Sequence, residues 1–327
     1  MIQEYTSKDE IIIDPFSGSG VIPLEAILHN RFIIASDINP YGNILTLGKL
    51  YPPNNYIDAI DTLLEVEEEV KTLQKKISLS DIPKWVRTFF HPKTLIETLA
   101  YSNILKKHEH NFQLACLLGI LHHQRIGFLS YPSSHSTPYL RNKNFPKEKF
   151  PELYTHRSVF VRLTRKIIRT LRETPSNKNK YIDKILLKDI RELSLKKESV
   201  DACITSPPYM NNLSYGRDNR LRLWILGYND WKIFDDPSFN RRSNFKELIE
   251  IFFQKMHKLL KHKGLCILIV GEARSQSLDS IILESAITGN FKLIDSVRNT
   301  IPSTRRTRRE NRGTIQETTF VFQKRGY

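Results

Sequence analysis

The sequence predicts an α/β protein whose doubly wound, mostly parallel sheet is interrupted by a helical insertion. Three observations predict this fold class. Short apolar strands near the N-terminus each lead into a helix, helical patterns fill the middle of the chain, and the strand–helix alternation then resumes. We therefore expect one α/β domain made of residues 1–50 and 181–327, and a helical insertion at residues 51–180.

The first fifty residues contain two strands that each precede a helix. A β-branched run at residues 11–13 ends at Asp14, and a helix is expected at residues 19–30. A second apolar run, at residues 32–36, ends at Asp37. Near-continuous apolar strands of this kind are typical of a parallel sheet that is covered on both faces.

The middle of the chain has the periodicity of amphipathic helices. Apolar side chains recur with helical spacing from residue 57 to residue 77, which predicts one long, half-exposed helix. Further helices are expected at residues 95–105, 114–121 and 153–171. The polar face of the last helix carries Arg157, Arg162, Arg165, Lys166, Arg169 and Arg172.

The last third of the chain returns to alternating strands and helices. Strands are expected at residues 182–187, 200–204 and 265–270, and a helix at residues 245–260. Two late strands, at residues 291–297 and 318–323, are expected to form a closing hairpin.

The charge balance favours a polyanionic partner. The chain has 327 residues, with 50 Lys and Arg against 35 Asp and Glu, which gives a formal net charge of +15. The N-terminus lacks the pattern of a signal peptide, and no apolar run approaches the roughly 20 residues of a membrane helix. We therefore expect a cytoplasmic protein with no membrane partner. The three cysteines share no Cys-x-x-Cys spacing, which argues against a disulfide framework and a cysteine zinc site.

The first motif is the glycine-rich turn Asp14-Pro15-Phe16-Ser17-Gly18-Ser19-Gly20. Glycines let a ligand lie against the main chain, although a tight strand-to-helix turn also uses them for structural reasons. A dinucleotide fingerprint requires a third glycine at position 23, where this chain has Pro23. Asp37 is placed to accept hydrogen bonds from ribose hydroxyls, and it is equally suited to cap a helix.

The second motif is Thr205-Ser206-Pro207-Pro208-Tyr209, directly after a buried strand. Proline fixes its own φ and pushes the preceding residue toward extended geometry. The segment is thus a stiff bend that presents a hydroxyl, a carbonyl and an aromatic ring together. By itself it is equally an ordinary loop that contains prolines.

The two motifs together resemble the S-adenosylmethionine-dependent amino-methyltransferases of DNA, which modify cytosine N4 or adenine N6. The resemblance implies a class I methyltransferase fold, which is Rossmann-like, with S-adenosyl-L-methionine as the cofactor and no metal. It also implies DNA as the substrate, in a restriction-modification setting, with a partner subunit or a cognate restriction endonuclease as a further partner.

The resemblance assigns a role to each motif. The first motif binds the methyl donor, and the implied cofactor-binding residues are Asp14, Pro15, Phe16, Gly18, Ser19, Gly20, Asp37, Ile38 and Asp189. The second motif holds the target amine, and the implied catalytic residues are Ser206, Pro207, Pro208 and Tyr209. Asp189 is equally a solvated loop acid.

The fold gives this pairing of motifs a physical basis. In a doubly wound sheet the first and fourth strands are neighbours where the strand order reverses, and ligands bind outside their carboxyl ends. If residues 11–13 and 200–204 are those strands, Asp14 and Ser206 meet. An exocyclic base amine is a poor nucleophile, and a hydroxyl and a carbonyl that accept its N–H groups favour the reactive, pyramidal form. Tyr209 can stack on the base, a contact worth about 1–3 kcal/mol.

Several alternatives stay open from the sequence. Serine at the first position of the second motif favours cytosine N4 by resemblance, while adenine N6, an RNA base and a catalytically silent nucleic-acid-binding subunit remain. The helical insertion is the candidate region for target recognition. The candidate nucleic-acid-binding side chains, each equally a solvated surface group, are Arg305, Arg306, Arg308, Arg309, Arg165 and Arg169.

One departure concerns the start of the chain. Relatives of this kind usually carry a segment that lines the methionine end of the donor pocket, often just upstream of the first motif. Only about ten residues precede Ile11. We therefore expect a permuted chain, a shortened chain or one that depends on a partner.

Overall fold

The computed structural model describes residues 1–134, 137–172, 179–208, 214–235, 242–271, 278–300 and 316–326. The chain forms two compact units. The α/β unit comprises Met1–Thr46, Lys178–Ser214 and Phe234–Tyr327, and the helical unit comprises Leu47–Asn177 and Tyr215–Ile233. Residues 215–233 thus cluster with the helical unit, whereas the sequence analysis placed them in the α/β domain.

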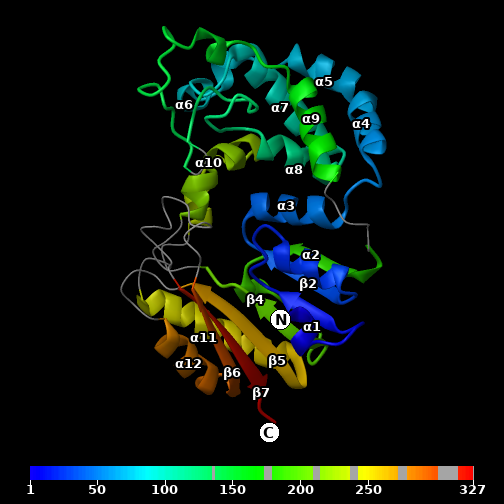
Figure 1. Cartoon of the computed structure of the whole chain (residues 1–327), viewed down its shortest axis with the longest axis vertical. Helices are drawn as coiled ribbons and strands as arrows, with labels where there is room; N and C mark the ends of the chain where they lie inside the picture. The colour runs from blue at the N-terminus through cyan, green and yellow to red at the C-terminus, as the bar shows by residue number, and fades with distance from the viewer. Residues whose placement is uncertain are drawn as a thin grey trace. The chain divides into compact units, whose positions relative to one another are not determined.

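The described residues form one seven-stranded sheet in the order β3-β2-β1-β4-β5-β7-β6. Figure 1 labels β2, β4, β5, β6 and β7 of this sheet. Its strands are β1 (Ile11–Asp14), β2 (Phe32–Asp37), β3 (Ile182–Leu187), β4 (Val200–Thr205), β5 (Leu260–Gly271), β6 (Phe291–Thr300) and β7 (Gln316–Lys324). The strands from β3 to β5 are parallel, and β7 is antiparallel to both β5 and β6. The predicted α/β, doubly wound, mostly parallel fold is confirmed, and the order reverses between β1 and β4.

One face of the sheet packs against two helices, α11 and α12. The helices of the α/β unit are α1 (Ile2–Tyr5), α2 (Val21–Leu28), α11 (Arg242–Leu259) and α12 (Asp279–Thr288), and α3 (Pro40–Leu50) begins in it. Short 3-10 turns lie at Asn179–Tyr181 and Ile190–Glu192. Along α11 the buried side chains recur at helical spacing, which makes one continuous apolar stripe: Phe245, Leu248, Ile249, Phe252, Phe253, Met256 and Leu259.

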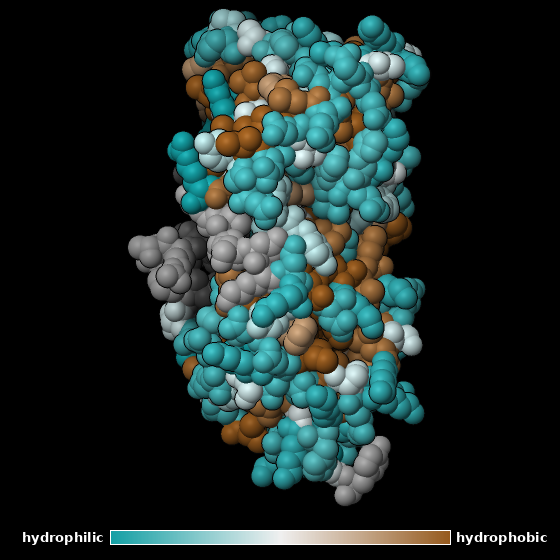
Figure 2. Space-filling view, turned by 90° about the vertical axis from the view of Figure 1, so that its right-hand side faces the viewer, coloured by the Kyte–Doolittle hydropathy of each residue, from teal (hydrophilic) through white to brown (hydrophobic). Residues whose placement is uncertain are grey.

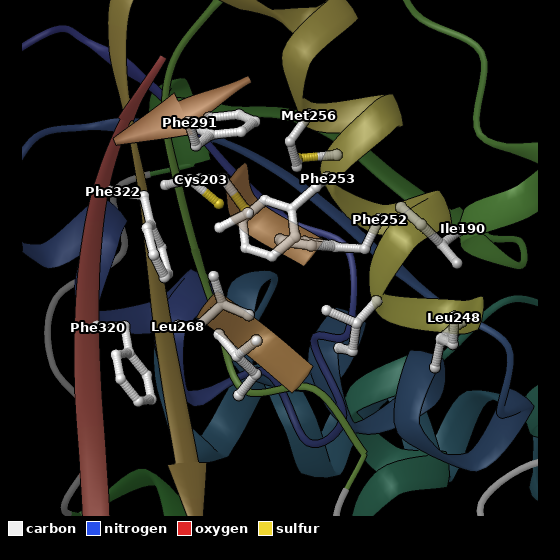
Figure 3. Packing of buried hydrophobic residues seen from close by; sticks show 14 of the residues in the cluster. Ile190, Cys203, Leu248, Phe252, Phe253, Met256, Leu268, Phe291, Phe320 and Phe322 are labelled. Atoms are coloured by element: carbon white, nitrogen blue, oxygen red, sulfur yellow. The ribbon is translucent and has the colours of Figure 1, made fainter. Parts of the chain in front are cut away.

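That stripe builds the core of the α/β unit. Phe253 packs edge-on against Phe322 of β7, with 5.3 Å between the ring centroids, and both side chains are buried (Figure 3). Cys203 of β4 belongs to the same cluster. Ile13 of β1 and Ile34 of β2 belong to this cluster as well. Side chains alternate across a strand, so Ile12 and Ile33 face the other side of the sheet. There α2 contacts both strands.

The helical unit is built from helices that the sequence predicts in part. They are α4 (Tyr56–Glu65), α5 (Glu67–Gln74), α6 (Lys84–Arg87), α7 (Pro92–Lys107), α8 (Asn111–Gly119), α9 (Val159–Leu171) and α10 (Tyr215–Leu226), with 3-10 turns at Leu79–Asp81, Pro151–Tyr154 and Trp231–Phe234. The prediction of one helix at residues 57–77 is wrong, because α4 ends at Glu65 and a separate helix, α5, begins at Glu67 after Val66. The inward face of α4 is set by Ala59 and Leu63, whereas Ile57 is 57% exposed.

Arg157 differs most from its prediction. It is 5% exposed and precedes α9, so its assignment to the cationic polar face of that helix is wrong. Its guanidinium donates to the carbonyl oxygens of Phe128 (2.8 Å), Leu153 (2.7 Å) and Ser130. Burial lowers its pKa to about 10, so the side chain is still charged at neutral pH.

The surface and the cysteines agree with a globular chain. Figure 2 shows one face on which hydrophilic side chains predominate, with hydrophobic patches between them. Cys116, Cys203 and Cys266 are free thiols, and all three are buried. Among the described residues, no helix is both long enough and apolar enough to span a membrane.

Candidate functional site

The two motifs meet at the carboxyl edge of the sheet. Strands β1 and β4 pair in parallel, with Ile12 opposite Ala202 and Ile13 opposite Cys203. Asp14 is the last residue of β1 and Thr205 is the last residue of β4. The Thr205 hydroxyl donates a 2.6 Å hydrogen bond to Asp14 Oδ1. The turns that follow β1 and β4 are therefore tied together at their first residues.

Asp14 is a buried carboxyl group. It is 1% exposed, and Oδ1 also accepts a 3.3 Å hydrogen bond from the Phe16 amide. Burial raises its pKa to about 7, and the Thr205 and Phe16 hydrogen bonds act in the opposite direction. Near neutral pH this group lies close to its midpoint, so its charge is sensitive to what occupies the edge of the sheet.

The glycine-rich turn is shaped by groups that the motif itself does not contain. Gly18 and Gly20 have positive φ angles of 51° and 75°, which other residues adopt only with strain. A Cβ on Gly20 would lie 2.6 Å from the Thr46 hydroxyl, so that glycine is required for packing. A Cβ on Gly18 would meet only the Phe16 carbonyl oxygen, at 3.9 Å. The space beside the Gly18 Cα is therefore open on the side where a Cβ would stand.

Asp37 holds this turn against the next strand. Its Oδ2 accepts a 2.7 Å hydrogen bond from the Gly18 amide, and its Oδ1 accepts one of the same length from the Asn39 amide. Burial raises the pKa of this carboxyl group, and the two backbone amides oppose that shift. The adjacent Ile38 is 43% exposed, which leaves an apolar surface beside the turn. The contact between Asp37 and a ribose stays a prediction.

The rest of the first motif anchors the turn. Pro15 is buried, and the ring of Phe16 lies 5.9 Å from that of Phe252 in the core. Ser17 donates its amide to the Ser36 carbonyl at 3.0 Å. The side chain of Ser19 is exposed. The motif thus combines an anchored start with an exposed end at the first turn of α2.

The second residue of the second motif, Ser206, carries a hydroxyl of defined direction. Ser206 Oγ donates to the carbonyl oxygen of Ile269 on β5, at 3.0 Å. A hydroxyl has one proton, so toward any further group this oxygen acts as an acceptor. Pro207 is buried and Pro208 is half-buried. Tyr209 lies outside the described residues.

Asp189 lies beside the end of β2. Lys188 donates its amide to the Asp37 carbonyl at 3.1 Å, and its own carbonyl accepts from the Ser36 hydroxyl at 2.9 Å. Asp189 then caps the turn Ile190–Glu192 by accepting from the Arg191 amide at 2.7 Å, and it pairs with the Arg191 guanidinium at 3.0 Å. Its side chain is 18% exposed. Asp189 therefore lies near Asp37 in the fold, but its carboxylate already binds the amide and the guanidinium of Arg191.

The candidate nucleic-acid-binding residues fall in two places. Arg305, Arg306, Arg308 and Arg309 lie outside the described residues. Arg165 and Arg169 are exposed on α9 of the helical unit. Within the part of the chain that the structure describes, no three His, Cys, Asp or Glu side chains come together as a metal site.

Sequence reasoning missed several residues that shape the site. Thr205 was seen only as part of the second motif, and Asn39 and Thr46 were not noticed. Gly42 was missed as well, although a Cβ there would lie 2.6 Å from the Gly18 carbonyl oxygen. A glycine one turn into the helix after Asp37 is the signal that was available for this close approach.

The strand order, with two polar turns joined at its reversal point, defines a class of protein: the Rossmann-like α/β proteins, a fold in which ligands bind outside the carboxyl ends of the strands at such a point. No family model matches the sequence. Among curated proteins the chain is similar to two type II methyltransferases. It is 25% identical to M.BsoBI of Geobacillus stearothermophilus over 261 residues, which are 71% of this chain and 50% of that protein. It is 23% identical to M.MvaI of Kocuria varians over 265 residues, 75% of this chain and 56% of that protein.

The chain thus spans about half the length of the curated relatives it matches. Among solved structures it is similar to TrmN from Thermus thermophilus, with a TM-score of 0.38 and 10% identity over 99% of this chain and 47% of the other. It is also similar to a SAM-dependent methyltransferase from Methanosarcina mazei, with a TM-score of 0.39 and 9% identity over 99% and 96% of the two chains.

Proposed function

We propose that this chain is an S-adenosylmethionine-dependent DNA methyltransferase that transfers a methyl group to an exocyclic base amine, with cytosine N4 as the acceptor. The observation that carries the proposal is the hydrogen bond between Thr205 and Asp14, which joins the end of the first motif's strand to the start of the second motif. The similarity to two type II methyltransferases supports the same class of reaction.

The first motif fits the methyl donor. The Gly18 backbone is open on the side where a Cβ would stand, and the exposed Ile38 offers an apolar surface for a flat ring. We assign Asp14, Pro15, Phe16, Gly18, Ser19, Gly20, Asp37, Ile38 and Asp189 to donor binding. When bound, S-adenosylmethionine supplies an activated methyl group on a positively charged sulfonium. A sulfonium bound near Asp14 would lower the pKa of its carboxyl group, because a nearby cation favours the charged form.

The second motif fits the acceptor. The proton of Ser206 points to Ile269, so its oxygen would accept an N–H of the target amine, and the Pro207 carbonyl would accept the other. Both contacts would favour the pyramidal amine whose lone pair attacks the methyl group. The rigid Pro207 and Pro208 would hold these acceptors in place, and Tyr209 would stack on the base.

The target base and the partners are finer parts of the same proposal. By the resemblance of the second motif to DNA amino-methyltransferases, serine at position 206 favours cytosine N4 over adenine N6. We assign target recognition to the helical unit. A base inside a duplex must be flipped out, at a cost of a few kcal/mol, before its amine reaches the site. A partner subunit or a cognate endonuclease would complete a restriction-modification system.

The test is to incubate the protein with methyl-labelled donor and either duplex DNA or tRNA, and to analyse the digested nucleosides by mass spectrometry. We expect label in N4-methylcytosine from the DNA sample. Label in N6-methyladenine would overturn the base assignment, and label only in tRNA would overturn the substrate. Binding of the donor without transfer to either polymer would overturn the activity.

A serine variant tests the role of the second motif. Ser206→Ala should lower turnover about 100-fold or more while donor affinity changes little, because the lost acceptor acts mainly in the transition state. The matched control is Ser199→Ala at the other end of β4, where the hydroxyl donates to the Lys196 carbonyl at an exposed position. Unchanged turnover in Ser206→Ala would show that the assigned role is wrong.

A further inference from the structure

The helix α9 gathers its cations on one flank. Arg162, Arg165, Lys166, Arg169 and Arg172 follow the spacing i, i+3, i+4, i+7 and i+10. At 100° per residue, these five side chains fall within an arc of about 120°. The buried stripe of the helix, which contains Val159, Leu163 and Ile167, lies on another side. We call this cationic flank the arginine face.

Two cations of the arginine face, Arg165 and Arg169, have no acidic complement in the part of the chain that the structure describes. Among the described residues, no carboxylate lies within ion-pair distance of Arg165 or Arg169. Burial lowers the pKa of the Arg162 guanidinium, and the charge of Arg165 adds to this shift. Like charges held this close repel one another, so a bound polyanion would relieve the repulsion.

A short loop is fixed beside this face. Residues 122–128, here called the pinned loop, are closed at the base where Leu129 donates its amide to the Ile120 carbonyl at 2.9 Å, and Ser130 makes the equivalent bond to Leu121. Inside the loop the rings of His123 and Phe128 stack, with 4.7 Å between their centroids.

Two arginines hold the pinned loop from the side of α9. The buried Arg157 donates to the Phe128 carbonyl at 2.8 Å. Arg162, on the arginine face, donates to the Ile126 carbonyl at the tip of the loop at 2.7 Å. The tip of the pinned loop is therefore held against the arginine face by the hydrogen bond from Arg162.

The tip of the loop is exposed and partly apolar. Residues 124–127 are all exposed, and Arg125 adds another cation beside Ile126. Ile126 is 69% exposed, more than any other large hydrophobic side chain among the described residues. A single exposed isoleucine needs no explanation, but one held rigidly between cations is placed to enter a groove whose walls are phosphates.

We propose that the arginine face and the pinned loop form one contact surface for duplex DNA. Arg165 and Arg169 bind backbone phosphates, and Ile126 enters the adjacent groove to contact base edges. The inference rests on the proposed function, because it identifies the surface of the helical unit that holds the substrate. Duplex DNA is proposed because its phosphates complement the positive charges of the arginine face. The apolar tip of the pinned loop indicates that this surface also enters a groove, in addition to contacting phosphates.

The phosphate part is tested by fluorescence anisotropy of a labelled duplex at several salt concentrations. The double variant Arg165→Gln/Arg169→Gln should bind at least about tenfold more weakly, and the slope of log K against log salt should become about 1.8 units less steep. The matched control Lys75→Gln/Lys76→Gln removes the same charge at exposed positions after α5. Equal effects in both double variants would show a non-specific charge effect and overturn the surface.

The groove part is tested by Ile126→Ser in the same assay. We expect a several-fold loss of duplex affinity with the salt slope unchanged, because no phosphate contact is removed. The control Ile57→Ser alters an isoleucine on α4 that is 57% exposed. An Ile126→Ser variant that binds like the control would overturn groove entry.

Two further measurements separate this surface from the proposed function. Donor affinity should be unchanged in all four variants, because none alters a residue assigned to the donor site. If the wild-type chain binds duplex through this surface but methylates no nucleic acid, the proposed activity fails and the surface stands. If the wild-type chain binds tRNA and not duplex DNA, or if donor affinity falls with Arg165→Gln/Arg169→Gln, the surface as proposed is wrong.

Discussion

Thr205 donates its hydroxyl proton to the carboxyl group of Asp14 across a sequence separation of 191 residues. Each residue ends a strand, and each strand leads into one of the two motifs. A single buried hydrogen bond therefore links the segment that we propose to bind the methyl donor with the segment that we propose to bind the target amine. Changes to either partner should affect both the stability of the sheet edge and the binding of the donor.

Replacement of Thr205 by valine tests this link. Thr205→Val keeps the size of the side chain and removes the 2.6 Å hydrogen bond to Asp14 Oδ1, which then accepts only the 3.3 Å bond from the Phe16 amide. We expect a loss of about 1–3 kcal/mol in the free energy of unfolding, measured by urea denaturation, together with weaker donor binding. Thr62→Val is the control, since Thr62 is half-buried and its hydroxyl makes a solvent-exposed hydrogen bond to the Asp58 carbonyl within α4. Equal stabilities of the two variants would contradict the role of the bond.

The pH dependence of stability should report the buried carboxyl group. Burial raises the pKa of Asp14 from its ordinary value of 3.8 to about 7 in the folded chain. Between these values the folded state binds more protons than the unfolded state, so stability falls as pH rises, by up to about 1.4 kcal/mol per pH unit, and then levels off.

Asp14→Asn removes this titration while keeping an oxygen that can accept from Thr205. Relative to the wild type, the variant should gain stability between about pH 5 and about pH 8, as urea denaturation at both values would show. Asp81→Asn serves as the control because Asp81 is exposed. Wild-type and Asp14→Asn curves that run parallel across this interval would contradict a raised pKa.

Gly42 on α3 should control the shape of the glycine-rich turn that we propose to bind the methyl donor. A Cβ in Gly42→Ala would lie 2.6 Å from the Gly18 carbonyl oxygen, so the turn must shift. We expect donor affinity to fall about tenfold or more, since backbone groups that contact a ligand tolerate little displacement. Isothermal titration calorimetry measures this directly.

The control for that variant is Gly119→Ala on α8. A Cβ there would meet only the end of the Lys166 side chain, at 3.7 Å. Alanine inside a helix stabilises it by up to about 1 kcal/mol relative to glycine, so this variant should keep its stability and its donor affinity. Normal donor binding by Gly42→Ala would show that the close approach of α3 has no functional consequence.

The buried arginine of the helical unit should be needed for its stability. Arg157→Met removes the donors for three carbonyl groups while roughly preserving the aliphatic volume. We expect a loss of about 3–5 kcal/mol in calorimetric or denaturant unfolding. Arg87→Met, at an exposed position on α6, should change stability by less than about 0.5 kcal/mol. A stable Arg157→Met variant would show that the pinned loop has other sufficient contacts.

The sequence predicts the strands well because each is a compact apolar run that ends at a polar residue. Asp14 and Asp37 follow such runs, and the neighbouring placement of β1 and β4 follows from the reversal of strand order. A helix is expected after the second strand, but the sequence does not give the bounds of α3 because Gly42 and Gly48 lower helix propensity, although both are required where backbones approach closely.

Other features depend on tertiary contacts that no local pattern encodes. The break at Val66 divides a region whose apolar spacing is helical throughout. Arg157 looks like a member of a cationic face, and only the carbonyl groups around it show that it is buried. Helix α10 follows the second motif in sequence but packs in the helical unit, because Ser102 and Lys106 of α7 donate to carbonyls at its end.

The most direct test of the central claim is a crystal structure of the chain with S-adenosylhomocysteine, the product of methyl transfer. We predict that the ligand lies along the Gly18 turn, with Ile38 against its adenine and its sulfur atom directed toward Ser206. A ligand bound at any other surface, or one whose sulfur atom points away from the end of β4, would contradict a single shared site built from the two motifs.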